Sequence, residues 1–136
     1  MEYIKGEPFF CQASKKIKAY TYINHDTETD ILIIGAGIDG SILNYFISQK
    51  YDVTLVEKSR IGLGCSSCAT ALLEYQLDDY ADNLRTYLSE EEIISAYNSG
   101  LTALDTLNNT IKKLGNKCEY SKRPTLLYTN NIFAKT

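Results

Sequence analysis

The chain has little of what several common classes of protein depend on. It contains a single histidine, His25, no long apolar run, and no excess of basic residues, with 14 Lys and Arg against 17 Asp and Glu. One histidine and one C-x-x-C pair do not supply the ligands of a structural zinc site. No segment approaches the length of a transmembrane helix, and a net charge of −3 offers no general attraction to nucleic acid or an anionic membrane. We therefore expect no metal, no nucleic acid and no membrane span.

The first residues also lack the apolar core of a secretory signal, because Glu2 and Glu7 interrupt them. This favours a cytoplasmic protein, in which cysteines remain reduced thiols. The four cysteines are Cys11, Cys65, Cys68 and Cys118. Only Cys65 and Cys68 have a suggestive spacing, and a redox-active dithiol is the alternative to two unreactive thiols there.

One stretch combines a strand, a glycine-rich turn, a helix and a second strand. Ile31–Ile34 is an uninterrupted apolar run, as expected for a strand that is covered on both faces. The motif G-x-G-x-x-G follows at once, over residues 35–40. The next segment predicts a helix that turns one apolar face to the sheet, formed by Ile38, Ile42 and Phe46. Val53–Val56 is the predicted second strand, so the stretch reads as one βαβ unit.

The glycine turn predicts a binding site for a dinucleotide. Gly35 permits a tight turn out of the strand, Gly37 leaves room for a pyrophosphate, and Gly40 lets the helix approach the strand. The phosphates would lie at the helix N-terminus, where free N–H groups and the helix dipole favour an anion. Ile38 and Asp39 complete the turn, and we expect Asp39 to face solvent while it stabilises the start of the helix.

Glu57 directly follows the second strand. A carboxylate at this point can accept hydrogen bonds from both hydroxyls of an adenosine ribose, and it would repel a 2′-phosphate. The strand, the turn, the helix and this acid together favour a dinucleotide site over an ordinary strand–turn–helix.

The segment after Glu57 is a polar loop that can surround a second part of the ligand. Gly62 and Gly64 make it flexible, and three hydroxyl side chains follow them: Ser66, Ser67 and Thr70. Such a loop exposes backbone and side-chain donors to an anionic or polar ligand. From these residues alone, a generic connecting loop capped by Thr70 is an equal alternative.

Residues 1–29 show no sustained helical or strand period, so we interpret them as an N-terminal arm whose aromatic side chains pack on the domain. Residues 30–136 form the predicted domain, of class α/β. Two parallel-type strands make a meagre sheet with unpaired edges. We therefore expect the domain to be incomplete within this chain, and to be completed by a further C-terminal segment or by self-association.

Helices and a short hairpin are predicted after the loop. Helical spacing that starts at Leu77 ends near Ser89, and a longer helix follows over residues 90–114, with Ser89 and Glu92 as its capping box. Gly115 closes this helix. Two short strands are predicted beyond it: Cys118–Tyr120 and Thr125–Thr129.

The segments DILIIGAGIDGSILNYFI, TLVEKSRIGLGCSSCATALL and KRPTLLY together resemble FAD-dependent oxidoreductases of the D-amino-acid oxidase and glycine oxidase superfamily, which includes glycerol-3-phosphate dehydrogenases. The resemblance spans Asp30 to Tyr128. The sequence V-E-K followed by I-G-x-G-x-S-S-x-x-T is more specific than the glycine motif, and it favours FAD over NAD. The resemblance implies a Rossmann-type FAD-binding domain that ends before the family's substrate domain.

This resemblance also implies particular roles. Glu57 would hold the ribose, and Lys58 would lie beside the adenine. The loop would pass beneath the pyrophosphate and isoalloxazine before it enters a helix, and its flavin-side residues would be Ser66, Ser67, Thr70, Ala71 and Leu72. The family reaction is hydride transfer to flavin from a small amine, amino acid or hydroxy substrate. The residues that hold the substrate come from other segments in the family, so we assign no catalytic residue.

Two other functions also fit these residues. An NAD-binding dehydrogenase module would share the glycine turn and Glu57 without needing the loop at residues 66–70. A non-catalytic nucleotide-binding fragment would suit a chain of this length.

Overall fold

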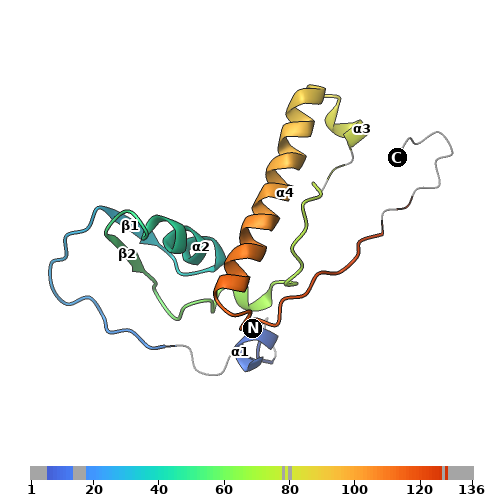
Figure 1. Cartoon of the computed structure of the whole chain (residues 1–136). Helices are drawn as coiled ribbons and strands as arrows, with labels where there is room; N and C mark the ends of the chain where they lie inside the picture. Colours follow the sequence, from blue (N-terminus) through green and yellow to red (C-terminus); the bar gives the residue numbers. More distant parts are fainter. Residues whose placement is uncertain (1–5, 14–17, 78, 80, 127, 129–136) are drawn as a thin grey trace, which may run out of the picture. The chain divides into compact units, whose positions relative to one another are not determined.

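The computed structural model describes residues 6–13, 18–77, 79, 81–126 and 128. Contacts within the chain divide it into two compact units, Met1–Leu72 and Leu73–Thr136. Figure 1 shows the elements of both. The chain mixes helices with a small parallel sheet, which is compatible with the predicted α/β class.

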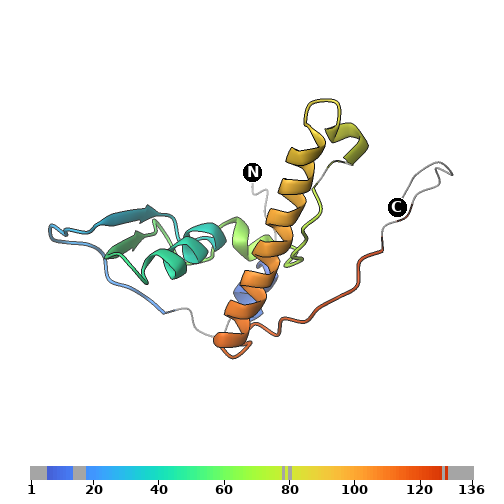
Figure 2. The ribbon, with the colours of Figure 1, turned by 45° about the horizontal axis from the view of Figure 1, so that its top comes forward.

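The first unit contains the predicted succession of strand, helix and strand. The elements β1 (Ile31–Ile34), α2 (Ile38–Ile47) and β2 (Val53–Val56) follow one another, and the two strands pair in parallel with Ile31 opposite Val53. Helix α2 lies against both strands (Figure 1 and Figure 2). A parallel pair needs such a crossover, because a tight turn cannot return the chain to the start of the neighbouring strand. Both strands have the bounds that the sequence predicted.

The apolar face that the spacing predicted for α2 is buried only in part. Ile42 is half-buried, whereas Ile38 is 51% exposed and Phe46 is 39% exposed. Gly40 lies so close to the end of β1 that an added Cβ would be 2.0 Å from the carbonyl oxygen of Gly35 and 3.4 Å from Ile33 Cγ2. The backbone of α2 at Gly40 therefore meets β1, a contact that apolar spacing does not predict.

Only one face of β1 is buried. Ile33 is buried, whereas Leu32 and Ile34 are 55% and 82% exposed. Alternate residues of a strand point to opposite faces of the sheet, and α2 packs against one of these faces only. The prediction that both faces of this strand are covered is therefore wrong within the described residues.

The loop after β2 contains one turn of 3₁₀ helix, η1 (Cys65–Cys68). Residues 69–77, which follow it, form neither helix nor strand. Within them Ala71 has a φ of 58°, a left-handed conformation that a continuous right-handed helix does not allow. The helix that the family resemblance implied directly after this loop is therefore not formed.

A short helix lies in the segment that the sequence predicted as an arm without regular structure. The helix α1 (Phe9–Ala13) packs against η1 in the same unit. Tyr20 and Tyr22, further along this arm, are 67% and 95% exposed. The expectation that the aromatic side chains of residues 1–29 pack on the domain is wrong for these two tyrosines.

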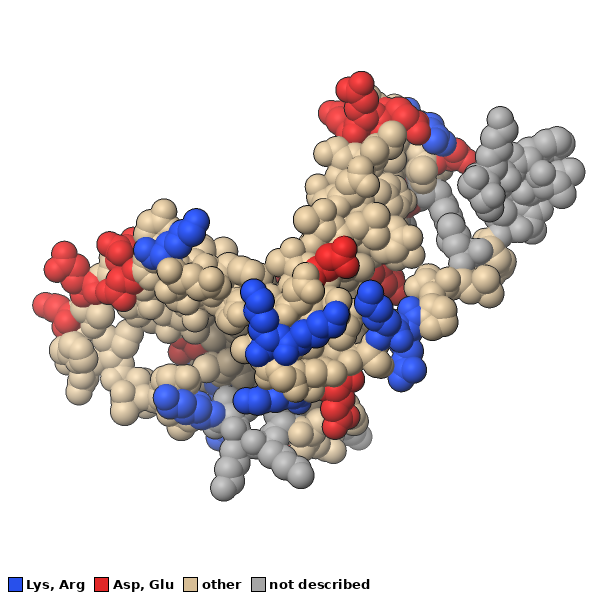
Figure 3. Space-filling view, viewed as in Figure 1, with Lys and Arg blue, Asp and Glu red and all other residues tan. Residues whose placement is uncertain are grey.

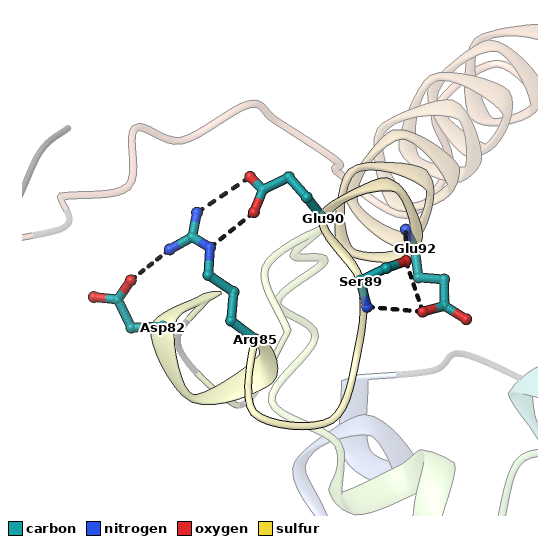
Figure 4. Close-up of polar contacts among 5 residues, drawn as sticks. All are labelled: Asp82, Arg85, Ser89, Glu90 and Glu92. Carbon is teal, nitrogen blue, oxygen red and sulfur yellow. Dashed lines mark hydrogen bonds and ion pairs between the residues drawn. The ribbon is translucent and has the colours of Figure 1, made fainter.

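The second unit contains the short helix α3 (Ala81–Leu84) and the long helix α4 (Glu90–Lys113). The N–H of Glu92 donates to Ser89 Oγ, and the N–H of Ser89 donates to the Glu92 carboxylate at 2.8 Å (Figure 4). The predicted capping box is therefore formed. Gly115 has a φ of 80° just beyond the helix, as the predicted helix-ending glycine requires.

Arg85 joins the two helices of this unit. Its guanidinium forms ion pairs with Asp82 in α3 and with Glu90 at the start of α4 (Figure 4). Both pairs are exposed, and exposed pairs typically contribute about 0–1 kcal/mol. The helix that was predicted to end near Ser89 is confined to α3, and Tyr80 lies outside the described residues.

Gly100 lies inside α4 and packs against Tyr75. An added Cβ would be 3.1 Å from the carbonyl oxygen of Tyr75 and 3.2 Å from its Cβ. The ring of Tyr75 also meets that of Tyr97 edge to face, with centroids 6.4 Å apart. A glycine inside a helix costs about 1 kcal/mol relative to alanine, and the close approach of Tyr75 accounts for its presence here.

The predicted hairpin is not formed in the described residues. The Asn116 side chain accepts a hydrogen bond from the N–H of Tyr120 at 2.7 Å and donates one to the carbonyl of Tyr120 at 3.0 Å. Asn116 and Glu119 both have positive φ, at 49° and 57°. These features hold residues 118–120 in a turn. In the second predicted strand, residues 125, 126 and 128 are irregular, and residues 127 and 129 lie outside the described residues.

Acidic side chains gather at the end of the second unit that carries α3 and the first turn of α4 (Figure 3). They include Asp82, Glu90, Glu91 and Glu92. Negative charge is favourable beside a helix N-terminus, because the helix dipole is positive there. This acidic group therefore has a structural explanation in the start of α4.

Candidate functional site

The glycine turn joins β1 to α2 through a tightly fixed backbone. The N–H of Gly35 donates to the carbonyl oxygen of Val56 at 2.7 Å, which extends the pairing of the two strands into the turn. Gly35 has a φ of 104°, a conformation that residues with a side chain rarely adopt. Together with the close approach at Gly40, this means that two glycines of the motif are required by the geometry of the turn itself.

Both backbone groups of Ala36, in the middle of the turn, are engaged. Its N–H donates to Glu57 Oε2 at 2.9 Å, and its carbonyl accepts from the N–H of Gly62 at 2.9 Å. Ala36 is 1% exposed, so little water competes for these bonds. The acid after β2 and the loop beyond it are thereby tied to the turn.

Glu57 accepts one backbone hydrogen bond on each carboxylate oxygen. Ala36 donates to Oε2, and the N–H of Ser59 donates to Oε1 at 3.0 Å. These donors, Ala36 first, hold the pKa of Glu57 below its ordinary value of 4.5. A carboxylate has about four acceptor positions, so about two remain available. The geometry thus suits an ionised acid that accepts two further donors, such as the hydroxyls of a ribose.

Ser66 connects η1 to the start of α2. Its Oγ accepts a hydrogen bond from the N–H of Ile38 at 2.9 Å. Gly37 occupies the N-cap position without a side chain to cap the helix, and a Cβ there would be 3.3 Å from the same Oγ. The Ser66 hydroxyl keeps its own hydrogen to donate to another group. A helix N-terminus beside a free hydroxyl donor is well suited to an anion.

These groups surround one cavity of about 700 Å³. Eight of the residues predicted for the site line it: Gly35, Gly37, Ile38, Asp39, Gly40, Glu57, Lys58 and Ser66. Its volume lies within the range of about 300–1,000 Å³ that is usual for ligand and cofactor pockets. Lys58 and Arg60 bring positive charge to it, which suits a diphosphate. Asp39 is exposed in the first turn of α2, where a carboxylate stabilises the helix.

The other four predicted residues do not line this cavity: Ser67, Thr70, Ala71 and Leu72. Ser67 is 3% exposed and shares its hydroxyl hydrogen between the carbonyl oxygens of Leu63 and Gly64, at 2.9 and 2.8 Å. Leu72 is 67% exposed. The structure therefore brings together the turn, Glu57 and Ser66, and it leaves Ser67, Thr70, Ala71 and Leu72 outside the cavity.

Several residues of the cavity were not assigned to it from the sequence. They are Ile34, Ser59, Arg60, Gly62, Leu63, Gly64, Cys65 and Ala69. The signal that could have identified Gly62 is its place in an I-G-x-G sequence soon after the acid, since its N–H binds the carbonyl of Ala36. The sequence predicted a flexible loop with exposed backbone donors, and it did not predict that the N–H of Gly62 binds the glycine turn.

In the described part of the chain no helix is long and apolar enough to cross a membrane. Within those same residues, no group of three or more His, Cys, Asp or Glu side chains is arranged to hold a metal ion. The four cysteines are free thiols, and Cys65 and Cys68 are exposed.

The match to a known family covers most of the chain. The model of the family DAO, described as FAD dependent oxidoreductase, matches residues 30–134, a range that includes the glycine turn, Glu57 and η1. The chain therefore belongs to this family of FAD-dependent oxidoreductases. The resemblance indicated by the sequence motifs is confirmed, and FAD is the cofactor of the family.

A curated relative comes from Bacillus subtilis (strain 168). It is named "Putative Rieske 2Fe-2S iron-sulfur protein YhfW" and is 24% identical to this chain over 123 residues. The aligned region covers 90% of this chain and 24% of that protein, so the chain spans about a quarter of the relative's length. No solved structure matches the chain.

Proposed function

We propose that the first unit binds FAD, with the pyrophosphate at the start of α2 and the adenosine ribose on Glu57. The observation that carries this proposal is that the glycine turn, Glu57 and Ser66 line the same cavity. Each of the three offers what a different part of the dinucleotide needs: an open backbone, an acceptor for hydroxyls, and a hydroxyl donor.

The pyrophosphate is assigned to Gly37, Ser66 and the first turn of α2. The N–H of Ile38 already donates to Ser66, so the free N–H groups that follow it in this turn are the partners for phosphate oxygens, and Gly37 leaves the approach to them open. Ser66 accepts from Ile38 at 2.9 Å and can donate its own hydrogen to a phosphate oxygen. Lys58 and Arg60 supply positive charge in the same cavity, which favours the negatively charged group further.

The ribose is assigned to Glu57 because its carboxylate is held in place before any ligand arrives. The hydrogen bonds from Ala36 and Ser59 fix both oxygens and leave acceptor positions for two hydroxyls. A 2′-phosphate would place negative charge against this ionised acid, so the site should discriminate against ligands that carry one.

Family resemblance assigns five residues to the flavin side: Ser66, Ser67, Thr70, Ala71 and Leu72. Because Ser66 contacts the start of α2, we assign it to the pyrophosphate and keep the other four for the flavin. In this conformation Ser67 is turned into its own loop and Leu72 is exposed. We expect residues 69–77 to change conformation when the isoalloxazine binds. The part of the site for adenosine and pyrophosphate needs no such change.

The reaction that we propose is the oxidation of a small amine, amino acid or hydroxy compound. FAD, when bound, would supply the hydride acceptor. The residues of this chain bind and orient the cofactor, and none of the described residues is assigned to the substrate. Because the chain spans 24% of its relative and one face of β1 is exposed, we propose that turnover needs further protein segments.

The name of the relative refers to a Rieske centre, which takes two histidine and two cysteine ligands. This chain has one histidine and cannot supply that ligand set by itself. We therefore assign FAD, and no iron–sulfur cluster, to these residues.

The absorbance spectrum of the purified protein tests the assignment. We expect the two visible bands of an oxidised flavin, and release of FAD rather than FMN on denaturation. Bound nicotinamide without a flavin band would favour the NAD-binding alternative. A flavin that never becomes reduced by any substrate, even with all segments of the enzyme present, would favour a non-catalytic nucleotide-binding protein.

A further inference from the structure

Cys65 and Cys68 lie at the two ends of the single 3₁₀ turn η1. In a 3₁₀ helix there are about three residues per turn, so side chains three apart point the same way, and a rise of about 2.0 Å per residue places their Cα atoms about 6 Å apart. Disulfides span Cα separations of about 4.4–6.8 Å. An ideal 3₁₀ turn therefore brings the Cα atoms of these two residues within the range that a disulfide spans, and closure needs their side chains to turn toward each other.

Both thiols are also available for reaction. Cys65 and Cys68 are exposed and unpaired with another cysteine, and Cys65 lines the cavity beside the glycine turn. Ser67 Oγ lies 3.6 Å from Cys68 Sγ. Because Ser67 already gives its hydrogen to two carbonyl oxygens, the thiol of Cys68 is the donor in this contact. Such a bond is weak, so it leaves Cys68 free to react.

Ser66, one of the two residues between the cysteines, touches the proposed phosphate site. Ser66 Oγ accepts the N–H of Ile38 at the first position of α2. A covalent link from Cys65 to Cys68 would enclose Ser66 in a small ring and restrict its backbone. The state of the two thiols is therefore coupled by structure to the helix N-terminus.

We propose that Cys65 and Cys68 form a reversible disulfide across η1, and that this disulfide holds Ser66 on the N–H of Ile38. The oxidant is a small-molecule disulfide such as oxidised glutathione. The Cys65 thiolate attacks one sulfur of that molecule and expels the other as a thiolate. The Cys68 thiolate then attacks Cys65 Sγ and expels the second thiolate. The pair loses two electrons and two protons, and two small-molecule thiols are formed.

Peptide mass spectrometry of the full chain tests the first half of the proposal. The protein is equilibrated in buffers with a stepwise increasing ratio of oxidised to reduced glutathione and then alkylated. We expect the peptide that carries residues 65–68 to lose two hydrogens and to resist alkylation, with reversal by dithiothreitol. The variant with Cys11→Ser and Cys118→Ser serves as the matched control and should behave in the same way. Only glutathione adducts on this peptide, or a link from either residue to Cys11, would overturn the proposal.

Amide hydrogen exchange tests the second half without reference to any cofactor. We expect the N–H of Ile38 to exchange about tenfold more slowly in the oxidised protein, because opening of the Ser66 contact is suppressed. The N–H of Ile93 in α4 is the internal reference and should not change. Equal exchange at Ile38 in the two redox states would show that the disulfide does not act on the helix N-terminus.

A consequence for the cofactor rests on the proposed function. If FAD binds at this turn, preorganisation of Ser66 should lower the Kd of FAD about threefold in the oxidised protein. Absence of FAD binding in both redox states would count against the proposed function alone, because the mass and exchange measurements would still decide the disulfide. If FAD binds equally well in both redox states while exchange at Ile38 is slowed, the predicted effect on FAD affinity is wrong and the disulfide is still supported.

Discussion

The two oxygens of the Glu57 carboxylate accept backbone hydrogen bonds from Ala36 and Ser59. One bond reaches into the glycine turn and the other into the loop after β2, so a single side chain fixes the position of both. The same carboxylate is the group that we assign to the ribose. Under this assignment, Glu57 would link the shape of the glycine turn to recognition of the adenosine.

Replacement of Glu57 by glutamine should weaken FAD binding about tenfold, which is the loss expected for one or two hydrogen bonds to a charged group. The amide would present N–H hydrogens to one of the two backbone donors, where the carboxylate presents lone pairs. Titration of FAD followed by flavin fluorescence gives the Kd. Glu91→Gln, on the exposed start of α4, is the matched control and should leave the Kd unchanged. Equal Kd values for FAD in the Glu57→Gln and Glu91→Gln variants would show that Glu57 does not bind FAD.

The lowered pKa of Glu57 predicts a pH dependence with a definite sign. Because the folded protein holds this pKa below the ordinary value of 4.5, the stabilisation from the ionised form is complete above that value. It is lost as the pH falls through the lower, folded pKa. We expect FAD affinity to be level from neutral pH down to that value and to fall below it. The Glu57→Gln variant should lack this acid limb, and an acid limb of unchanged size in the variant would contradict the assignment.

Gly37→Val should reduce FAD affinity more than about tenfold, because its methyl groups would lie where backbone and phosphate must meet. A Cβ alone would already be 3.3 Å from Ser66 Oγ. Ser48→Val places the same side chain at the other end of α2 and is the matched control. Circular dichroism should show both variants folded. A folded Gly37→Val protein with the affinity of the Ser48→Val protein would place the phosphate elsewhere.

At the level of elements, the sequence correctly predicted the features that depend on residue type and short-range spacing. It did not predict the features that depend on contacts between elements or on side-chain hydrogen bonds to the backbone. The bounds of β1 and β2, the capping box of Ser89 and Glu92, and the helix end at Gly115 all follow from residue type and spacing. The apolar face predicted for α2 is buried only in part, and the contact of Gly40 with the end of β1 was not predicted. Residues 118–120 form a turn and not the predicted strand, because the Asn116 side chain binds the backbone of Tyr120. Strand propensity does not take such a side-chain hydrogen bond into account.

The residues predicted for the candidate site also fall into two groups, those that line the cavity and those that do not. The glycine turn, Glu57 and Ser66 were all predicted as site residues, and they line one cavity. The resemblance placed Ser66 beside the flavin, whereas its hydroxyl lies on the N–H of Ile38 at the start of α2. The hydrogen bond from Gly62 to Ala36 was not predicted, because it is made by a backbone N–H and the residue type does not reveal it. Ser67, Thr70, Ala71 and Leu72 were assigned to the flavin side by resemblance, and their positions depend on a backbone path that the motif does not fix.

Gly100→Ala tests the packing of α4 against Tyr75. Alanine gains about 1 kcal/mol of helix propensity, but its Cβ would be 3.1 Å from the carbonyl oxygen of Tyr75, and overpacking typically costs about 1–3 kcal/mol. We expect a net loss of unfolding free energy of about 1 kcal/mol in chemical denaturation. Ser99→Ala, at an exposed neighbour, should not destabilise the protein. A Gly100→Ala protein more stable than the parent would show that Tyr75 does not pack there.

At the scale of the whole molecule, one face of β1 is exposed, and the chain spans 24% of the length of its curated relative. We predict that these 136 residues will not turn over substrate, because a cavity that holds a cofactor on one side leaves the reactive ring without a substrate pocket. The assay uses excess FAD and a panel of amino acids, amines and glycerol-3-phosphate, with flavin bleaching and peroxide as readouts. Specific, substrate-dependent flavin reduction by the pure chain would contradict the prediction.

The central claim is that the cavity at the glycine turn binds the ADP half of FAD, and competition binding tests it most directly. FAD is titrated into the protein, and ADP and adenosine 2′-phosphate 5′-diphosphate are then added as competitors. We predict saturable FAD binding that ADP displaces, with the 2′-phosphorylated ligand at least about tenfold weaker because Glu57 repels its phosphate. Absence of saturable FAD binding, or displacement by the 2′-phosphorylated ligand as readily as by ADP, would contradict the account.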